Sequence, residues 1–591
     1  MMKRYFLPIA LLIFLLLSLS ACGESHSPNR SLAFELLDNG TYAVVGIGTY
    51  NADDLIIPAE YNNAPVTQIA SNAFRDVWYI QSVTLPPSVT VIGNNAFNGC
   101  RKLKKIYVAD LTLWCQASFH SALTQNDFSL YLNGELVETL VIPSAVETIA
   151  DSAFKNCISL KKVIFEDGVR VISANAFAGC RNLSEILLAD TVTTIRERAF
   201  VGNAVTQLTL PNTVTSLGSA AFSNCKKLTS VTLSDSITEI PESSFSYCEK
   251  LSRINFPQSI TTIGNDAFYC CTSLTHLVLP EALITIGDNA FFRCEKLMGI
   301  VMRDHLTTIG EDAFACCTAL STITFSKSLA TIGDGAFGYC KNLTAISLPM
   351  SVTSLGTKAF AYCESLKTVY IGKNVSSIGE NCFFYCPYRE TITVSPENAT
   401  YRSVSNCLIE RKTNTLILGT ARSVIPSDVE KIGNYAFERL AFLTEITIPD
   451  SIKELGIGVF YSCLSLKSVT LPQNITKIPS HAFSSCYGLY TITLPESVTV
   501  IDANAFASCG ISSLTLHEGI QKIGDRAFAE CNSLRSITIP KSITGIGDRI
   551  FMNCYDITVY CKASEAGPEW NEHWSGHDGK TVWGAAAPST P

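Results

Sequence analysis

Cysteine is the residue type with the widest chemical scope in this chain, because the 591 residues include 23 cysteines. A thiol can form a disulfide, bind a metal ion or act as a redox group. Sixteen of the cysteines share one register, three residues after a recurrent Phe; the segment 266–280, DAFYCCTSLTHLVLP, is one example. The cysteines in this register either take part in one of these reactions or pack in the core.

The shared register favours packing. Side chains at one position of a stacked repeat point the same way along the stack, which is poor geometry for the dihedral angle of about 90° that a disulfide needs. A zinc site needs four converging ligands, and the sequence has no Cys-x-x-Cys pair. A free cysteine behaves as a small buried hydrophobic residue. We therefore predict that these cysteines lie in the core and that no metal is bound.

Two cysteines fall outside that register. Cys270 and Cys316 stand two residues after their Phe, where other copies carry Gly, Asn or Tyr, and Arg293 holds the same position between them. We expect both side chains to face outward. They lie two repeats apart, too far for a disulfide without movement of the backbone. Two exposed, unreactive thiols are one interpretation, and a redox role is the other.

Motifs of common enzyme classes are missing from the sequence. It has no serine in a nucleophile elbow, no HExxH and no glycine-rich phosphate loop after a strand. His573, His577 and Asp578 could hold a metal, although the histidines of such a loop more often lie on the surface. The sequence thus predicts a protein without catalytic activity and without a cofactor.

Tyrosines occupy the position of Cys270 in three successive copies, as Tyr339, Tyr362 and Tyr385, with Tyr247 further back. Stacked in the fold, they would form an aromatic stripe, and tyrosine combines a large contact area with a polar tip. The stripe is a candidate site for a sugar or a protein. The alternative is that the rings only shield one flank of the molecule.

A second candidate site lies among residues expected to face outward from a row of short strands. Most of these positions carry Ser or Thr, which makes a polar and uncharged face. Arg253, Asn255 and His276 differ from that pattern in adjacent copies, and Gly299 would leave a hollow beside His276. These residues are a candidate ligand site, and ordinary surface variation is the alternative.

A repeat positions all of these side chains. We count 19 copies, usually 23 residues apart, of L-x-x-I-x-L, then I/V-x-x-I, then Gly and the Phe. In L-x-x-I-x-L, alternate residues lie on one face of a short strand, and that face is buried only when the next copy stacks on it. The sequence predicts a parallel β ladder, a short second strand in each copy, and a helical or 3₁₀ turn that carries the Phe.

These motifs, together with IGxxAFxxC, resemble the BspA-like leucine-rich repeat family of bacterial surface lipoproteins over about residues 31–584. The resemblance implies a β-rich leucine-rich-repeat solenoid of about 20 repeats, capped at both ends, with irregular inserts near 111–140 and 386–424. It also implies adhesion to host matrix proteins or to other cells.

The expected organisation has six parts. They are a lipoprotein signal peptide (1–21), a tether (22–30), an N-terminal capping hairpin (31–65), the solenoid (66–560), a cap containing tryptophan (561–584) and a tail (585–591). The sequence LSAC, residues 19–22, resembles the lipobox, which implies lipidation of Cys22; a signal peptidase that cuts after Ala21 and leaves a free thiol is the alternative. Gly23 allows a lipid-anchored protein on the extracellular face of the bacterial envelope.

The charge pattern limits the partners. Lys and Arg total 44 against 52 Asp and Glu, a net charge of −8, and no basic block follows residue 4. Phosphate binding needs clustered positive charge, so a nucleic-acid partner is not expected. We expect a monomer that binds an extracellular protein or glycan and contacts the membrane through the lipid on Cys22. The alternative is a structural surface spacer without a specific ligand.

Overall fold

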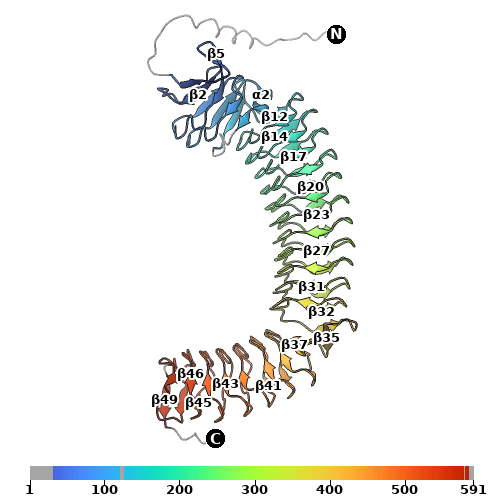
Figure 1. Cartoon of the computed structure of the whole chain (residues 1–591), viewed down its shortest axis with the longest axis vertical. Coiled ribbons are helices and arrows are strands. Elements are labelled where there is room, and N and C mark those ends of the chain that lie inside the picture. Colours follow the sequence, from blue (N-terminus) through green and yellow to red (C-terminus); the bar gives the residue numbers. More distant parts are fainter. Residues whose placement is uncertain (1–30, 120–125, 578, 585–591) are drawn as a thin grey trace, which may run out of the picture.

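The computed structural model describes residues 31–119, 126–577 and 579–584, and these form one elongated, curved solenoid (Figure 1). Successive copies of the repeat make successive turns that pair in parallel, as the sequence predicts. The solenoid changes direction near β35 (Tyr401–Val404), β36 (Cys407–Glu410) and β37 (Thr415–Leu418). Cys22, with the signal peptide and tether expected at 1–30, lies outside the described residues.

The segment L-x-x-I-x-L forms a strand of three or four residues in most turns, and we call this row of strands the wide ladder. In β20 the side chain of Val231 is buried while Ser230 and Thr232 are not, because neighbouring residues of a strand point to opposite faces. The strands are β3 (Asp54–Ile56), β6 (Ser82–Leu85), β8 (Lys105–Val108), β10 (Ser129–Leu132), β12 (Thr139–Ile142), β14 (Lys162–Phe165), β16 (Glu185–Leu187), β18 (Gln207–Thr209), β20 (Ser230–Thr232), β22 (Arg253–Asn255), β24 (His276–Val278), β26 (Gly299–Val301), β28 (Thr322–Thr324), β30 (Ala345–Ser347), β32 (Thr368–Ile371), β34 (Thr391–Val394), β39 (Glu445–Thr447), β41 (Ser468–Thr470), β45 (Ser536–Ile539), β47 (Thr558–Cys561) and β49 (Lys580–Trp583).

The segment I/V-x-x-I forms a second parallel row, the narrow ladder, in which nearly every strand has two residues. Its last apolar residue points into the core, as Ile263 does in β23. The strands are β5 (Ala64–Ile69), β7 (Val91–Ile92), β9 (Ser118–Phe119), β13 (Thr148–Ile149), β15 (Val171–Ile172), β17 (Thr194–Ile195), β19 (Ser216–Leu217), β21 (Glu239–Ile240), β23 (Thr262–Ile263), β25 (Thr285–Ile286), β27 (Thr308–Ile309), β29 (Thr331–Ile332), β31 (Ser354–Leu355), β33 (Ser377–Ile378), β38 (Lys431–Ile432), β40 (Glu454–Leu455), β42 (Lys477–Ile478), β43 (Val500–Ile501), β44 (Lys522–Ile523), β46 (Gly545–Ile546) and β48 (Glu569–Trp570).

The segment that carries the Phe consists of overlapping turns, which differs from the helical or 3₁₀ turn expected. Cys248 N donates to Phe245 O at 3.2 Å within one such turn. Two residues before and after the Phe the backbone is left-handed, with φ of 56° at Ser243 and 59° at Tyr247. These left-handed residues interrupt any helix. The freed N–H of Phe245 donates to Ala267 O of the next turn at 2.9 Å, so the turns also bond along the solenoid.

The Phe rings of successive turns stack inside the core. Neighbouring ring centroids lie 5.0–5.9 Å apart from Phe154 to Phe383 and 5.4–5.7 Å apart from Phe437 to Phe551. Offset stacking of this kind adds to the gain from burial. The apolar residues of both ladders complete two core clusters that meet near β36.

The structure places the cysteines of the shared register in the core. Each of them apart from Cys157 donates its thiol to the carbonyl O of the preceding Phe in the series, at Sγ–O distances of 2.8–3.5 Å. Burial raises the pKa of the Cys100 thiol to about 11 and that of the Cys225 thiol to about 12. Cysteine suits the position because it is small and apolar yet has a weak donor for a buried carbonyl.

Hairpins and a helix interrupt the repeat. In the first insert, α2 (Leu111–Gln116) is the one α-helix of the described ranges, and Asp110 caps its first turn through a bond from Leu113 N at 3.0 Å. β11 (Glu135–Leu136) then pairs antiparallel with β10 around Asn133–Gly134. In the second insert, β35, β36 and β37 form an antiparallel meander. Helix α2 was not predicted, since six residues are too few to show helical periodicity.

A buried ion pair crosses the second insert. The side chains of Arg389 and Glu438 are 0% and 1% exposed, with Nη1 3.9 Å from Oε1. The guanidinium also donates to the carbonyl oxygens of Phe383 and Gly419, both at 3.2 Å. The Glu438 carboxylate accepts a bond from Tyr385 N, and burial raises its pKa although Arg389 acts in the opposite direction. These bonds join the last turn before the insert to the first turn after it.

Both ends of the solenoid carry extra elements. β1 (Ala33–Leu36) and β2 (Tyr42–Gly46) form an antiparallel hairpin, and β2 and β4 (Glu60–Tyr61) both pair with β5. At the other end, the rings of Trp570, Trp574 and Trp583 lie within 5.1–6.0 Å of one another. Covered ends prevent the open ladder edges from pairing with other chains. In the described part of the chain, no helix has the length and hydrophobicity to span a membrane.

Candidate functional site

The tyrosines singled out in the sequence form a continuous ring stack on the surface. The ring centroids of Tyr339 and Tyr362 are 4.3 Å apart with planes inclined by 4°, and those of Tyr362 and Tyr385 are 5.0 Å apart. Tyr339 is 43% exposed, and the other two are half-buried. We call these three residues the tyrosine stack. It presents a row of aromatic edges with a hydroxyl on each ring.

The stack ends on a cation that the sequence analysis missed. The guanidinium of Arg439 lies 4.0 Å from the ring centroid of Tyr385 and 5.4 Å from that of Tyr461. Arg439 stands two residues after Phe437, which is the repeat position of the tyrosines. The position of Arg439 in the repeat could therefore have placed it beside Tyr385, although the second insert separates the two residues in the sequence. A guanidinium over an aromatic face is attracted by the ring quadrupole. The stack and Arg439 together offer both aromatic and cationic contacts.

The backbone at the tyrosine stack favours other residue types. Tyr339, Tyr362 and Tyr385 have φ of 60°, 59° and 57°, in the left-handed region that Gly and Asn adopt most readily. Asn156 and Asn224 hold the equivalent position in other turns with φ of 63° and 59°. Folding therefore does not require tyrosine at these positions, and each bulky ring there carries a conformational cost.

The second candidate site is more dispersed. Arg253 and Asn255 lie exposed on β22, and His276 lies exposed on β24. These strands belong to consecutive turns, but β22 closes one three-stranded sheet and β24 opens the next. Gly299 pairs with His276 in register. A residue without a side chain therefore lies beside His276, as the expected hollow requires. The structure thus arranges these side chains on one row without bringing them into a common pocket.

Cys270 and Cys316 are half-buried, whereas every other cysteine of the described segments is buried. Both have left-handed backbone, with φ of 59° and 61°, as the tyrosines do. Burial raises the pKa of both thiols, and the nearby Arg293 only partly offsets this. Because the thiolate is the reactive form, these environments do not activate either cysteine.

A thiol reagent therefore has two targets in the native protein between Cys100 and Cys561. We expect Cys270 and Cys316 to be modified, more slowly than a free cysteine at neutral pH because their pKa is raised. The remaining cysteines of that range should react only after denaturation. Mass spectrometry of peptides labelled before and after denaturation tests this, and native labelling of Cys294 or Cys340 would contradict the buried register.

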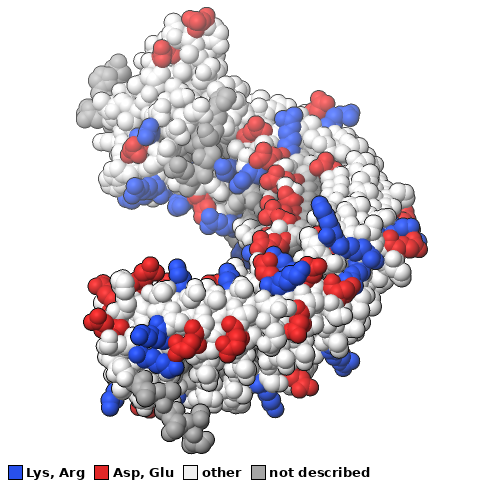
Figure 2. Space-filling view, turned by 60° about the horizontal axis from the view of Figure 1, so that its bottom comes forward, with Lys and Arg blue, Asp and Glu red and all other residues white. Residues whose placement is uncertain are grey.

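Like charges also gather in rows across neighbouring turns (Figure 2). One row is acidic: Glu242, Asp266, Asp288, Asp312 and Asp334 follow one another along the turns. Burial, followed by repulsion from neighbouring carboxylates, raises the pKa of Asp266 and Asp312. The described residues contain no group of three or more His, Cys, Asp or Glu side chains placed to hold a metal ion.

Replacing Asp312 with Asn should stabilise the protein at pH 7 by roughly 0.2–1 kcal/mol. The substitution removes the repulsion between Asp312 and the carboxylates of Asp288 and Asp334 in the neighbouring turns, which resembles the repulsion between like charges on adjacent strands. The folded state raises the pKa of Asp312 and so binds its proton more tightly, which means that wild-type stability falls as pH rises through that pKa. The difference between the proteins should vanish below the ordinary pKa of 3.8. Denaturant titrations at pH 3 and pH 7 measure it.

Asp304 provides the matched control, because the ion pair with Lys327 lowers its pKa. Asp304→Asn should not stabilise the protein at pH 7. A destabilised Asp312→Asn would contradict the repulsion inferred for the acidic row.

His573 and His577 occupy the last turn, and Asp578 lies outside the described residues. The Nδ1 atom of His577 accepts a hydrogen bond from Gly579 N at 2.8 Å, and His573 lies 3.6 Å from the Glu572 carboxylate. The side chain of Trp574, next to His573 in the chain, is buried. The described side chains bring no further carboxylate, thiol or imidazole group to a metal position here.

Comparisons with known proteins place the chain in a family. The model of the BspA type leucine rich repeat region matches in six copies, at residues 51–134, 126–204, 193–318, 284–410, 420–519 and 499–564. The comparison with curated proteins gave no match.

Solved structures with similarity include a leucine-rich repeat protein from Eubacterium ventriosum, with 23% identity over 51% of this chain and 87% of that chain and a TM-score of 0.43. A leucine rich cell surface protein from Faecalibacterium prausnitzii has 22% identity over 95% and 100%, with a TM-score of 0.25. The pneumococcal vaccine antigen PcpA has 18% identity over 69% and 92%, with a TM-score of 0.35. Because this family model matches well over half of its residues, the chain belongs to the BspA-type leucine-rich-repeat family.

Proposed function

We propose that this protein is a non-catalytic binding solenoid of the adhesin type, which holds an extracellular protein or glycan against the tyrosine stack. Proteins of this family are typically surface proteins, and their fold is generally non-enzymatic. A lipid on Cys22 would anchor the chain to the bacterial envelope and leave the solenoid free to act as a monomer. Host matrix proteins and other cells are the partners of this proposal, and nucleic acid is not among them.

One observation carries the proposal: three stacked tyrosines occupy backbone positions that favour Asn or Gly. Bulky residues in left-handed conformations cost free energy, and such costs collect at functional sites. Tyr and Arg dominate the binding energy of many protein interfaces, and aromatic rings also pack against sugars. The tyrosine stack and Arg439 provide both residue types side by side.

The wide ladder favours a second candidate function, that of a surface spacer without a ligand. Its outward positions are mostly Ser and Thr, for example Thr322 and Thr324 on β28, which are exposed and uncharged. A face of this kind offers few anchors for a partner. A spacer would use the length of the solenoid and not its side chains.

A binding array separates the two functions. We would apply the purified protein to extracellular-matrix proteins, mucins and glycans, together with an Arg253→Ser, His276→Ser variant, because Ser recurs at outward positions such as Ser230 and Ser468. Saturable binding to at least one component supports the adhesin function, and the variant tests whether β22 and β24 contribute. No binding anywhere on the array would favour the spacer.

A further inference from the structure

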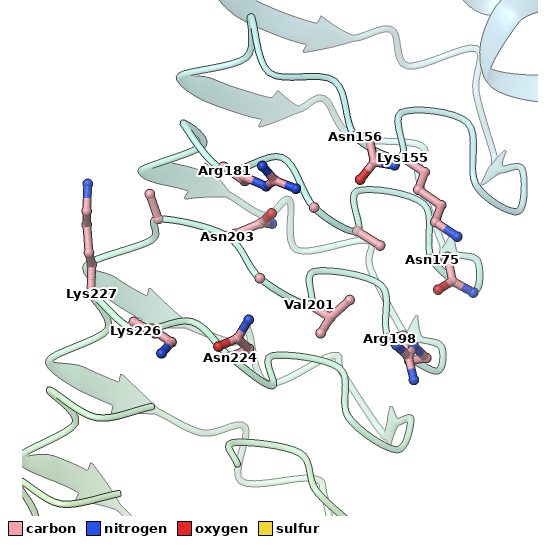
Figure 3. A pocket seen from close by; sticks show the side chains of 14 residues that line it. Lys155, Asn156, Asn175, Arg181, Arg198, Val201, Asn203, Asn224, Lys226 and Lys227 are labelled. Carbon is pink, nitrogen blue, oxygen red and sulfur yellow. The ribbon is translucent and has the colours of Figure 1, made fainter. Parts of the chain in front are cut away.

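The turn that contains Phe200 is one residue shorter than most turns of the solenoid. β18 begins at Gln207, seven residues after Phe200, whereas β20 begins at Ser230, eight residues after Phe222. The missing residue comes from the loop that elsewhere follows the cysteine of the shared register. This turn therefore follows a shorter path between its neighbours, and a pocket of about 440 Å³ opens there (Figure 3).

Two glycines line the same pocket. Gly179 and Gly202 stand two residues after their Phe, with φ of 73° and 75°, and both line the pocket. Neighbouring turns fill this position with Asn156 and Asn224. A Cβ atom at Gly202 would meet nothing closer than 3.9 Å, so the space beside it is open. Ligand pockets in proteins commonly have volumes of about 300–1,000 Å³, and this one falls within that range.

A buried amide without a hydrogen-bond partner lies in the pocket wall. Asn203 is 3% exposed, and in the described structure neither its Oδ1 nor its Nδ2 atom has a partner. Asn203 holds the position that is cysteine in 16 of the 19 copies. Figure 3 shows its side chain between Arg181 and Asn224. A buried polar group without a partner is destabilising, so its presence calls for a ligand or a water molecule.

Five cationic side chains line the pocket, and none of the lining residues is acidic. Arg181 and Lys226 also form ion pairs with Asp127 and Glu249 outside the pocket. Within the described ranges, Lys155, Arg198 and Lys227 have no ion-pair partner. Burial, and after it the positive charge of Arg198, lower the pKa of Lys155. Water at Asn203 would satisfy the amide, but the clustered positive charge would still attract an anion to the pocket.

The geometry points to a binding site for an oxyanion borne on a sugar, the sulfate or carboxylate of an acidic saccharide. Arginine and lysine bind both groups through charge-assisted hydrogen bonds. The amide of Asn203 supplies a donor and an acceptor for a neutral hydroxyl, and the volume exceeds that of a bare anion. A nucleic acid fits less well, because the cations are confined to one pocket and do not form an extended surface. This site lies at residues 155–227, apart from the tyrosine stack, so it stands or falls independently of the proposed function.

Calorimetric titration of the intact protein tests the site with four probes at constant ionic strength: glucose 6-sulfate, glucuronic acid, glucose and sodium sulfate. We expect the two charged sugars to bind and to compete with each other, glucose not to bind, and sodium sulfate to bind more weakly than glucose 6-sulfate. Failure of both charged sugars to bind would overturn the proposal. Sodium sulfate that binds as tightly as glucose 6-sulfate would also overturn it, because the sugar would then contribute nothing.

Variants taken from neighbouring turns separate binding from folding. Gly202→Asn fills the pocket with the residue found at Asn224 and should abolish binding. Lys155→Ser with Arg198→Asn should weaken binding roughly tenfold for each cation removed. Lys250→Asn is the control, since Lys250 holds the position of Lys227 one turn later and does not line the pocket; its affinity should stay within about twofold of wild type.

Asn203→Cys restores the residue of the shared register and keeps every cation. It should raise the denaturation midpoint, because the buried amide without a partner is gone, and it should weaken binding of glucose 6-sulfate. Unchanged affinity in both Gly202→Asn and Asn203→Cys would overturn the placement of the sugar in this pocket.

Discussion

Arg389→Ala should destabilise the protein by about 3–5 kcal/mol, since it leaves the carboxylate of Glu438 buried without its charged partner. It also removes the donors to Phe383 O and Gly419 O. These bonds connect the two core clusters, so the clusters should lose their coupling as well as stability. Scanning calorimetry of Arg389→Ala should show two separate unfolding transitions. In the wild type, the two parts should unfold closer together in temperature.

A double variant identifies the cause. Arg389→Met with Glu438→Leu removes both charges together, and apolar replacement of a buried ion pair is often neutral or stabilising. We expect it to recover most of the stability that Arg389→Ala loses. If Arg389→Ala unfolds at the wild-type temperature in a single transition, the ion pair does not hold the clusters together.

Phe314→Ala is expected to cost about 3–5 kcal/mol, the range for truncating a fully buried Phe. Its ring stacks on Phe291 at 5.1 Å and on Phe337 at 5.3 Å, so the cavity breaks the aromatic row in both directions. In a repeat protein each turn depends on its neighbours, and an interior gap therefore weakens the turns on either side. A urea titration followed by far-ultraviolet circular dichroism measures the shift in midpoint.

Phe442→Ala is the matched control, because Phe442 is 64% exposed and its loss should change stability by less than about 0.5 kcal/mol. Equal midpoints for Phe314→Ala and Phe442→Ala would show that the stacked rings contribute little to stability.

The parallel ladders could be predicted from the sequence because their cause is periodic. Alternation of apolar and polar residues in segments such as 230–233 fixes the face of each strand, and recurrence every 23 residues fixes the stacking. The left-handed turn beside each Phe was not predicted. Its signal was present, since Asn and Gly recur two residues from the Phe, but Tyr, Cys and Arg at the same position concealed it.

Three of the 19 copies lack cysteine in the shared register, and the structure shows that their surroundings differ. Val77 belongs to the first copy, which has no earlier Phe carbonyl to satisfy. Leu440 follows the second insert, where Arg389 takes over the donation to Phe383 O. Asn203 follows Phe177 at the regular distance, so a cysteine at this position would have a carbonyl to bond. The copy carries instead an amide without a hydrogen-bond partner, which distinguishes it from the other two. Pairing across an insert and the shape of a pocket depend on tertiary contacts, so spacing alone could not give them.

The tyrosine stack was predicted from the shared position of its three residues in successive repeats. Its role in binding is the central claim of the proposed function. The most direct measurement is the affinity of the wild type and of the variant Tyr339→Asn, Tyr362→Asn, Tyr385→Asn for the component that the array identifies. Asn suits the left-handed backbone, so the variant should fold with at least comparable stability. We predict that its affinity falls by a factor of about 30 or more, as expected when central aromatic residues are removed from an interface. A variant that folds and binds as tightly as the wild type would contradict the account.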